Sequence, residues 1–254
     1  MILLKGNMLK RLLSLAGLIV FVSIVSVLWI YHFSGTLFRA ARWILTWTFV
    51  AGTVAGIIGA VIKNSLKSRN VNRPAARHSL DSVIEHWGTA VGIFILTVSG
   101  LQIYNRGGIA GIKVHFLGLF FTLLFGAYFL ADFFISKKFQ TLFPTVKDIV
   151  HGTIGKYLFR LKVNETGKYL SSQKSSFLAF IISGGLIFIS GIIKLIPYYG
   201  HIPFQVLRVA TKIHDISALA FGIILAIHIL LVIAHRANWP LLRSWFDGKA
   251  HDGH

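Results

Sequence analysis

Six long apolar runs alternate with polar or basic stretches along the chain. Each run holds roughly 20 residues, the length that an α-helix needs to cross a hydrocarbon core about 30 Å thick. The pattern therefore predicts an all-α integral membrane protein with six spanning helices. The predicted spans are residues 12–33, 43–62, 82–104, 114–135, 176–196 and 213–234.

The spans fall into two predicted domains. Residues 1–70 are expected to form a transmembrane hairpin followed by a basic linker, and residues 71–254 a bundle of four helices joined mostly by short loops. The one long loop, residues 136–175, is expected to hold a short amphipathic helix on the membrane surface. The second helix of the hairpin carries a stripe of small residues at four-residue spacing, which allows close helix contact. The stripe fits either packing within this chain or docking of a partner's transmembrane helix; it consists of Gly52, Gly56 and Ala60.

Composition supports the membrane assignment and defines a topology. Only 13% of the residues are charged, whereas soluble domains hold about 25%. The net charge of +18 is unevenly distributed, because 19 of the 26 Lys and Arg residues lie in the segments on the N-terminal side of the membrane. This asymmetry predicts that both termini are cytoplasmic. It indicates topology and contact with anionic lipid rather than nucleic-acid binding. The first apolar run is long and lacks a small-residue cleavage site, so we expect a retained helix rather than a signal peptide.

The histidines are the candidate chemistry of this chain. There are no cysteines, which excludes disulfides, thiolate-bound metals and covalently attached haem. Seven histidines are expected at helix ends, in loops or in the tail, where water solvates the imidazole: His32, His78, His151, His201, His235, His251 and His254. Four lie within predicted spans, where ionisable groups are costly and usually functional: His86, His115, His214 and His228.

The four span histidines form two pairs by depth. Fourteen residues along a helix turn about 1400° and rise about 21 Å, so His214 and His228 share one helix face at two levels. The antiparallel order of the spans places His86 near the level of His228 and His115 near that of His214. Two ligand pairs at two levels fit two bis-histidine b-type haems. Seven glycines are expected to leave room for the flat macrocycles: Gly88, Gly92, Gly118, Gly184, Gly185, Gly191 and Gly222.

Other uses of four membrane histidines fit the pattern less well. A zinc or copper site would gather its ligands at one depth, and a proton-relay transporter would carry carboxylates near the midplane of the membrane. A haem-free polytopic transporter or assembly subunit is the alternative interpretation.

Several motifs resemble a known family, the cytochrome b (gamma) subunit of membrane-bound formate dehydrogenases and related respiratory di-haem cytochromes. The resemblance covers about residues 77–249, and the first hairpin lies outside it. The motifs are "EHWGTAVGIFILTVSGLQIY" (85–104), "VHFLGLFF" (114–121), "GKYLSSQKSSF" (167–177), "SGIIKLIPYYGHIPFQVLRVATKIH" (190–214) and "AIHILL" (226–231).

The resemblance implies a function in respiratory electron transport. It implies that His86 and His228 ligate the haem on the cytoplasmic side, and that His115 and His214 ligate the outer haem. The protein would lie in a prokaryotic cytoplasmic (inner) membrane and perform no substrate chemistry except at quinone.

The resemblance also implies partners. An iron–sulfur subunit and a molybdenum or tungsten catalytic subunit would deliver electrons to the outer haem, and menaquinone or ubiquinone would be reduced beside the inner one. The residues implied for quinone binding are Lys168, Tyr169, Ser172, Gln173 and His228.

Overall fold

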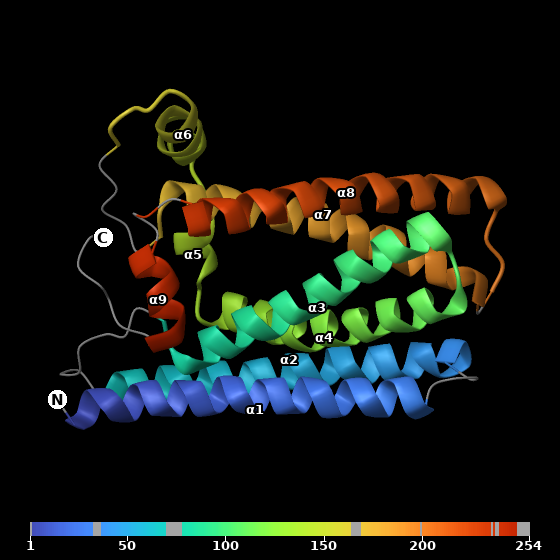
Figure 1. Ribbon diagram of the computed structural model, residues 1–254, viewed down its shortest axis with the longest axis horizontal. Helices are drawn as coiled ribbons and strands as arrows, with labels where there is room; N and C mark the ends of the chain where they lie inside the picture. The colour runs from blue at the N-terminus through green and yellow to red at the C-terminus, as the bar shows by residue number, and fades with distance from the viewer. Residues whose placement is uncertain are drawn as a thin grey trace. The chain divides into compact units, whose positions relative to one another are not determined.

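All regular structure in the described residues is helical (Figure 1). The computed structural model describes residues 2–32, 37–69, 78–163, 169–198, 200–234, 236 and 239–247. The helices are α1 (Ile2–His32), α2 (Leu37–Arg69), α3 (Leu80–Arg106), α4 (Ile109–Ile135), α5 (Phe139–Leu142), the π-helix η1 (Asp148–Gly155), α6 (Lys156–Leu158), α7 (Ser171–Leu195), the 3₁₀-helix η2 (Ile196–Tyr198), α8 (Phe204–Ala234) and α9 (Trp239–Asp247).

Five helices are long and apolar enough to cross a membrane, and they confirm five of the six predicted spans. They are Trp43–Ser65, Leu80–Arg106, Ala110–Ile135, Ser171–Leu195 and Phe204–Ala234. The first predicted span lies on α1, whose apolar stretch among the described residues is the shorter segment Leu13–Ser26. That span therefore stays a prediction.

The last span begins earlier than predicted. Helix α8 starts at Phe204, directly after Pro203, rather than at residue 213. The apolar window missed these first turns because they contain Arg208 and Lys212. As a result, His214 lies about 15 Å inside the helix and not at its first turn.

The chain divides into two compact units, Met1–Ser136 with Ala237–His254, and Lys137–Arg236. In the first unit, α3 and α4 form an antiparallel hairpin. Gly107 and Gly108 make its turn, with φ angles of 62° and 104° that glycine adopts without a steric penalty. The N–H of Gly107 donates to the carbonyl of Ile103 and closes the last turn of α3.

Three glycines of this hairpin have a different role from the predicted one. A Cβ on Gly92 would lie 3.0 Å from the carbonyl oxygen of Gly118, and a Cβ on Gly118 would lie 3.0 Å from the carbonyl oxygen of Gly92. A Cβ on Gly88 would clash with the ring of Phe125. The prediction that these glycines leave room for a haem is therefore wrong: they allow α3 to lie directly against α4.

The small-residue stripe of α2 packs against α4. A Cβ on Gly56 would lie 2.8 Å from the Cβ of Ala131, and Ala60 is 1% exposed. A Cβ on Gly52 would clash with the carbonyl of Leu124. Of the two interpretations of this stripe, packing within the chain is confirmed.

A buried charge cluster joins α2, α3 and α4 at the end of the first unit where α3 begins. The ammonium of Lys63 on α2 pairs with Asp81 on α3 at 3.0 Å and also with Asp132 on α4. The hydroxyl of Ser136 donates to Asp132 at 2.6 Å. Glu85, which is 3% exposed, lies close by, and one oxygen from each of the three carboxyl groups falls within 4.8 Å of the others. Lys63 therefore neutralises part of a concentrated negative charge in a largely apolar protein.

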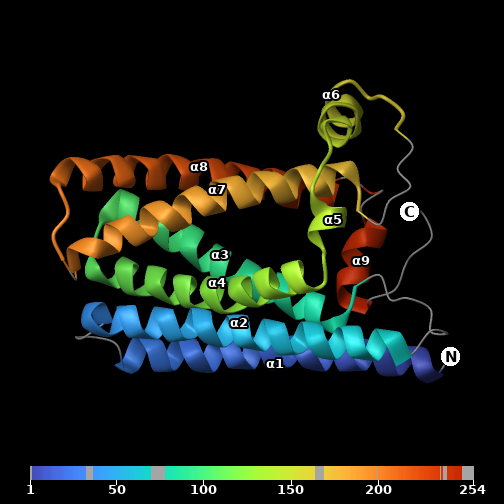
Figure 2. The same cartoon turned by 180° about the vertical axis from the view of Figure 1, so that it is seen from behind.

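The second unit is built on the antiparallel pair α7 and α8, which lie side by side in both views (Figure 2). Phe180 and Phe221 contact each other across the pair, with ring centroids 5.0 Å apart. The short helix predicted in the long loop is present as η1 followed by α6. It packs against α7.

We expect the variant Lys63→Met to destabilise the protein by about 2 kcal/mol, because it leaves buried carboxylates without their cation. A fully buried pair would lose more, but the side chain of Lys63 is 25% exposed. Thermal unfolding of the detergent-solubilised protein measures the effect. The exposed Lys162→Met is the control, and Lys63→Met/Asp132→Leu should recover part of the loss. Equal stability of Lys63→Met and the control would contradict this account of the cluster.

Candidate functional site

His115 is held within the first unit by a serine–glycine pair. It lies on α4, six residues after the start of the helix, and faces Ser99 and Gly100 near the end of α3. The Ser99 hydroxyl oxygen is 3.0 Å from His115 Nδ1, and Ser99 is fully buried. A Cβ on Gly100 would lie 3.7 Å from His115 Cε1. The imidazole thus fits against a surface formed by two small residues.

His214 has the same surroundings in the second unit. It lies on α8 and faces Ser190 and Gly191 near the end of α7. The Ser190 hydroxyl oxygen is 3.2 Å from His214 Nδ1, and the carbonyl oxygen of Ile187 is 3.1 Å from the same nitrogen. A Cβ on Gly191 would lie 3.4 Å from His214 Cε1. Gly191 therefore gives space to the imidazole itself.

His86 is enclosed by aromatic rings of the first unit. The ring of Trp245, on α9, stacks on His86 with centroids 4.3 Å apart, and on His78 with centroids 3.9 Å apart. The neighbouring residues Trp87 of α3 and Phe246 of α9 also contact each other, with ring centroids 5.3 Å apart. The prediction that His78 is solvated is wrong, because Trp245 covers it and leaves it 5% exposed.

His228 lies on α8, fourteen residues after His214. Its ring meets Phe180 of α7 edge to face, with centroids 5.8 Å apart. A Cβ on Gly222, between the two histidines, would meet no other side chain or helix within 4 Å, and the same holds for a Cβ on Gly185 of α7. Two of the seven glycines that were expected to leave room, Gly185 and Gly222, therefore face open space in this unit.

Three of the predicted quinone residues, Tyr169, Ser172 and Gln173, lie at or just before the start of α7, and the last two form hydrogen bonds within this unit. The side-chain oxygen of Gln173 accepts the backbone N–H of Leu170 at 3.0 Å and caps the helix. The hydroxyl of Ser172 accepts from Tyr157 at 3.4 Å. Tyr169 is half-buried, and Lys168 lies outside the described residues. Phe180, which contacts His228, lies about 12 Å further along α7 than Ser172. His228 is therefore about that far from the start of α7.

Asp148, a residue that the sequence analysis did not single out, organises this end of the second unit. Its carboxylate accepts from the backbone N–H and hydroxyl of Thr145 at 2.9 Å each and from Ser171 at 2.9 Å. It also pairs with the ammonium of Lys174 at 3.2 Å. Burial alone would raise the pKa of this carboxyl. The hydrogen bonds and the ion pair instead hold the pKa of Asp148 well below its ordinary value.

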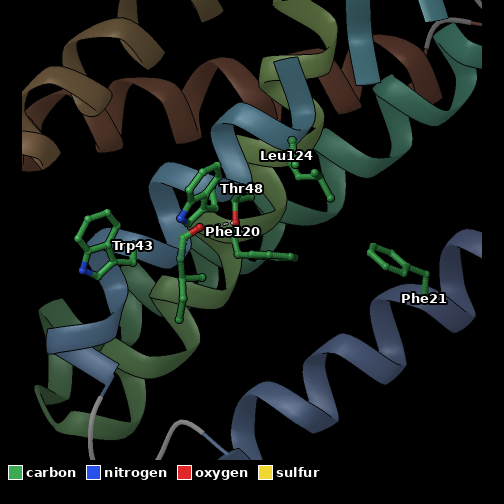
Figure 3. A pocket seen from close by; sticks show the side chains of 8 residues that line it. Phe21, Trp43, Thr48, Phe120 and Leu124 are labelled. Atoms are coloured by element: carbon green, nitrogen blue, oxygen red, sulfur yellow. Dashed lines mark hydrogen bonds between the residues drawn. The ribbon is translucent and has the colours of Figure 1, made fainter. Parts of the chain in front are cut away.

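An apolar groove lies elsewhere in the first unit, between α1, α2 and α4 (Figure 3). Phe21 approaches it from α1, while Trp43 and Thr48 line it from α2 and Phe120 from α4. The Thr48 hydroxyl donates to the carbonyl of Ile44 at 2.6 Å. None of the four span histidines lines this groove, and its lining offers no ionisable group.

The donor set fits b-type haem. All four imidazoles lie on long apolar helices, as predicted, and imidazole nitrogen is a usual axial ligand of haem iron. Each predicted ligand pair takes one histidine from each compact unit. Because the contacts above lie within single units, they do not test the pairing, which stays a prediction. The supporting residues Ser99 and Ser190 were missed, although a signal existed: a Ser-Gly pair lies on the helix before α4, which carries His115, and on the helix before α8, which carries His214.

Comparisons with known proteins agree on one family. Residues 77–248 match the prokaryotic cytochrome b561 family. The formate dehydrogenase cytochrome b556(fdo) subunit of Escherichia coli K12 is 28% identical over 166 residues, which cover 60% of this chain and 76% of that subunit. The subunits of the same name from Escherichia coli O6:H1 and O157:H7 match equally well. No solved structure matches the chain significantly.

We expect Asp148→Asn to lower the thermal stability of the protein at neutral pH and to have less effect in acid. Because the folded state lowers the pKa of Asp148, its contribution is complete above the ordinary value of 3.8 and is lost as the pH falls through the lowered pKa. The difference in unfolding temperature between variant and wild type should therefore shrink between about pH 5 and about pH 2. Asp215→Asn, at an exposed ion pair, is the control. A difference that does not change with pH would contradict the assigned role.

Proposed function

Because the chain belongs to the prokaryotic cytochrome b561 family, we propose that it is the di-haem b subunit of a respiratory oxidoreductase. Family membership and the five apolar helices make it a multi-pass protein of a prokaryotic inner membrane. A cytochrome b carries b-type haem and transfers electrons.

The proposed ligands are His86 and His228 for one haem and His115 and His214 for the other. One observation carries this assignment. In the first unit, His115 contacts Ser99, which lies 13 residues after His86 along α3. In the second unit, His228 lies 14 residues after His214 along α8. Both distances correspond to about 20 Å of helix. Each unit thus separates its two histidines by the same length, as two ligand pairs at two levels require.

The proposed topology has six spans, with both termini in the cytoplasm. Residues 1–70 then form the hairpin domain and residues 71–254 the four-helix cytochrome domain. This orientation places His115 and His214 near the outer surface and His86 and His228 near the cytoplasm. It follows the distribution of Lys and Arg.

The proposed partners follow from the similarity to a formate dehydrogenase cytochrome subunit. An iron–sulfur subunit, fed by a molybdenum or tungsten catalytic subunit, donates electrons at the outer haem. Quinone, as menaquinone or ubiquinone, accepts them beside the inner haem. Haem supplies the one-electron chemistry when bound, while the chain provides the imidazoles on long apolar helices.

The proposed quinone site lies at the start of α7. The predicted residues there are Tyr169, Ser172 and Gln173, with His228 further along the hairpin; the predicted Lys168 lies outside the described residues. Gln173 and Ser172 hold the backbone and Tyr157 in place. We assign Tyr169 to donate its hydroxyl proton in a hydrogen bond to a quinone oxygen.

The ligand assignment is tested by haem content. We expect purified protein to show a b-type reduced-minus-oxidised spectrum and two haems per chain. His115→Ala and His214→Ala should remove one and the same haem, while His86→Ala and His228→Ala should remove the other. His151→Ala, on the exposed side of η1, is the control and should keep both. A colourless wild type, or loss of different haems from His115→Ala and His214→Ala, would contradict the assignment.

The quinone site is tested by the kinetics of haem reduction. We expect Tyr169→Phe to slow reduction by a soluble quinol by about twofold to tenfold, the cost of one hydrogen bond. Reduction by dithionite should be unchanged. Tyr104→Phe is the matched control, because Tyr104 lies in the last turn of α3 and is 81% exposed. If quinol reduces Tyr169→Phe as fast as wild type, Tyr169 is not part of the site.

A further inference from the structure

We propose that Ser99 and Ser190 are twin positioning residues that fix the proton on Nδ1 of His115 and His214 and so direct Nε2 of each ring to iron. The proposal rests on the proposed function, because it takes both histidines as haem ligands. It adds two residues from two different helices to the outer haem site.

Each serine hydroxyl has a single proton to donate. The Ser99 hydroxyl lies 2.6 Å from the carbonyl oxygen of Ile95, one turn earlier on α3. The Ser190 hydroxyl lies 2.6 Å from the carbonyl oxygen of Leu186, one turn earlier on α7. A carbonyl oxygen only accepts, so each serine donates its proton to its own helix. The oxygen of each hydroxyl then has only lone pairs to offer to the imidazole.

An acceptor facing Nδ1 requires that Nδ1 carries the proton. For His214 a second contact leads to the same result, since the carbonyl oxygen of Ile187 also lies 3.1 Å from Nδ1 and can only accept. In a neutral imidazole with the proton on Nδ1, the lone pair is on Nε2. Nε2 is therefore the nitrogen that each ring presents to iron.

The same arrangement occurs independently in the two compact units. In each, a Ser-Gly pair lies near the end of one helix and the histidine lies on the next helix. The serines are 0% and 2% exposed, so no water competes for these contacts. The adjacent glycines, Gly100 and Gly191, have the imidazole Cε1 as the nearest atom to a Cβ position. The serine thus orients the ring, and the glycine gives it space.

An acceptor on Nδ1–H has a measurable consequence. Donation from Nδ1–H increases the electron density on Nε2, which favours the oxidised iron and lowers the midpoint potential. Removing the serine oxygen should raise the potential of that haem. In Ser190→Ala the rise should be partial, because the carbonyl of Ile187 continues to accept from His214.

The test is a redox titration of the purified di-haem protein in which the two haems are resolved by wavelength. The outer haem is identified as the one that is absent from His115→Ala. We expect Ser99→Ala and Ser190→Ala each to raise the midpoint potential of this haem and to leave the other unchanged. The double variant should show a larger rise than either single variant. Ser183→Ala is the matched control, because Ser183 is buried, donates to the carbonyl of Ala179 at 2.7 Å and lies on the same helix as Ser190.

The outcomes separate the two levels of the proposal. Loss of the outer haem from Ser99→Ala or Ser190→Ala, with Ser183→Ala intact, supports the positioning role. Wild-type potentials in both serine variants overturn it, and so does an equal effect of Ser183→Ala. If His115→Ala retains both haems, the failure lies in the proposed function instead.

Discussion

In hydrocarbon there is no water to satisfy a polar side chain, so an imidazole at membrane depth needs a partner within the protein. The contact between a serine hydroxyl and Nδ1 supplies it for His115 and His214. The same hydroxyl is satisfied by a carbonyl of its own helix. These hydrogen bonds join α3 to α4 and α7 to α8. The same helix pairs are also held by the Gly107–Gly108 turn, the close contact of Gly92 with Gly118, and the Phe180–Phe221 pair.

The two ends of each hairpin differ in physical character. Near the helix ends that hold Ser99 and Ser190, hydrogen bonds orient the imidazoles. At the other level, aromatic rings surround them: Trp245 stacks on His86, and Phe180 contacts His228. Hydrogen bonding and aromatic packing influence a bound haem differently, because the first changes ligand basicity and the second mainly changes polarity and access. The two proposed haems should therefore have different potentials, which suits directional electron transfer.

The apolar runs predicted five confirmed helices because hydropathy over 20 residues is a local property. The start of α8 was misplaced because Arg208 and Lys212 interrupt the apolar pattern without interrupting the helix. The role of a glycine depends on its neighbour: Gly88 meets Phe125, whereas Gly222 faces open space. No local pattern distinguishes these two residues. His78 was assigned to solvent for the same reason, since its partner Trp245 is 167 residues further along the chain.

The central claim is that two irons join histidines of the two compact units. An experimental structure of the purified protein with bound haem tests it most directly. The account predicts one iron between Nε2 of His115 and Nε2 of His214, and a second iron between His86 and His228. An iron held by two histidines of the same unit, or a single haem, would contradict it.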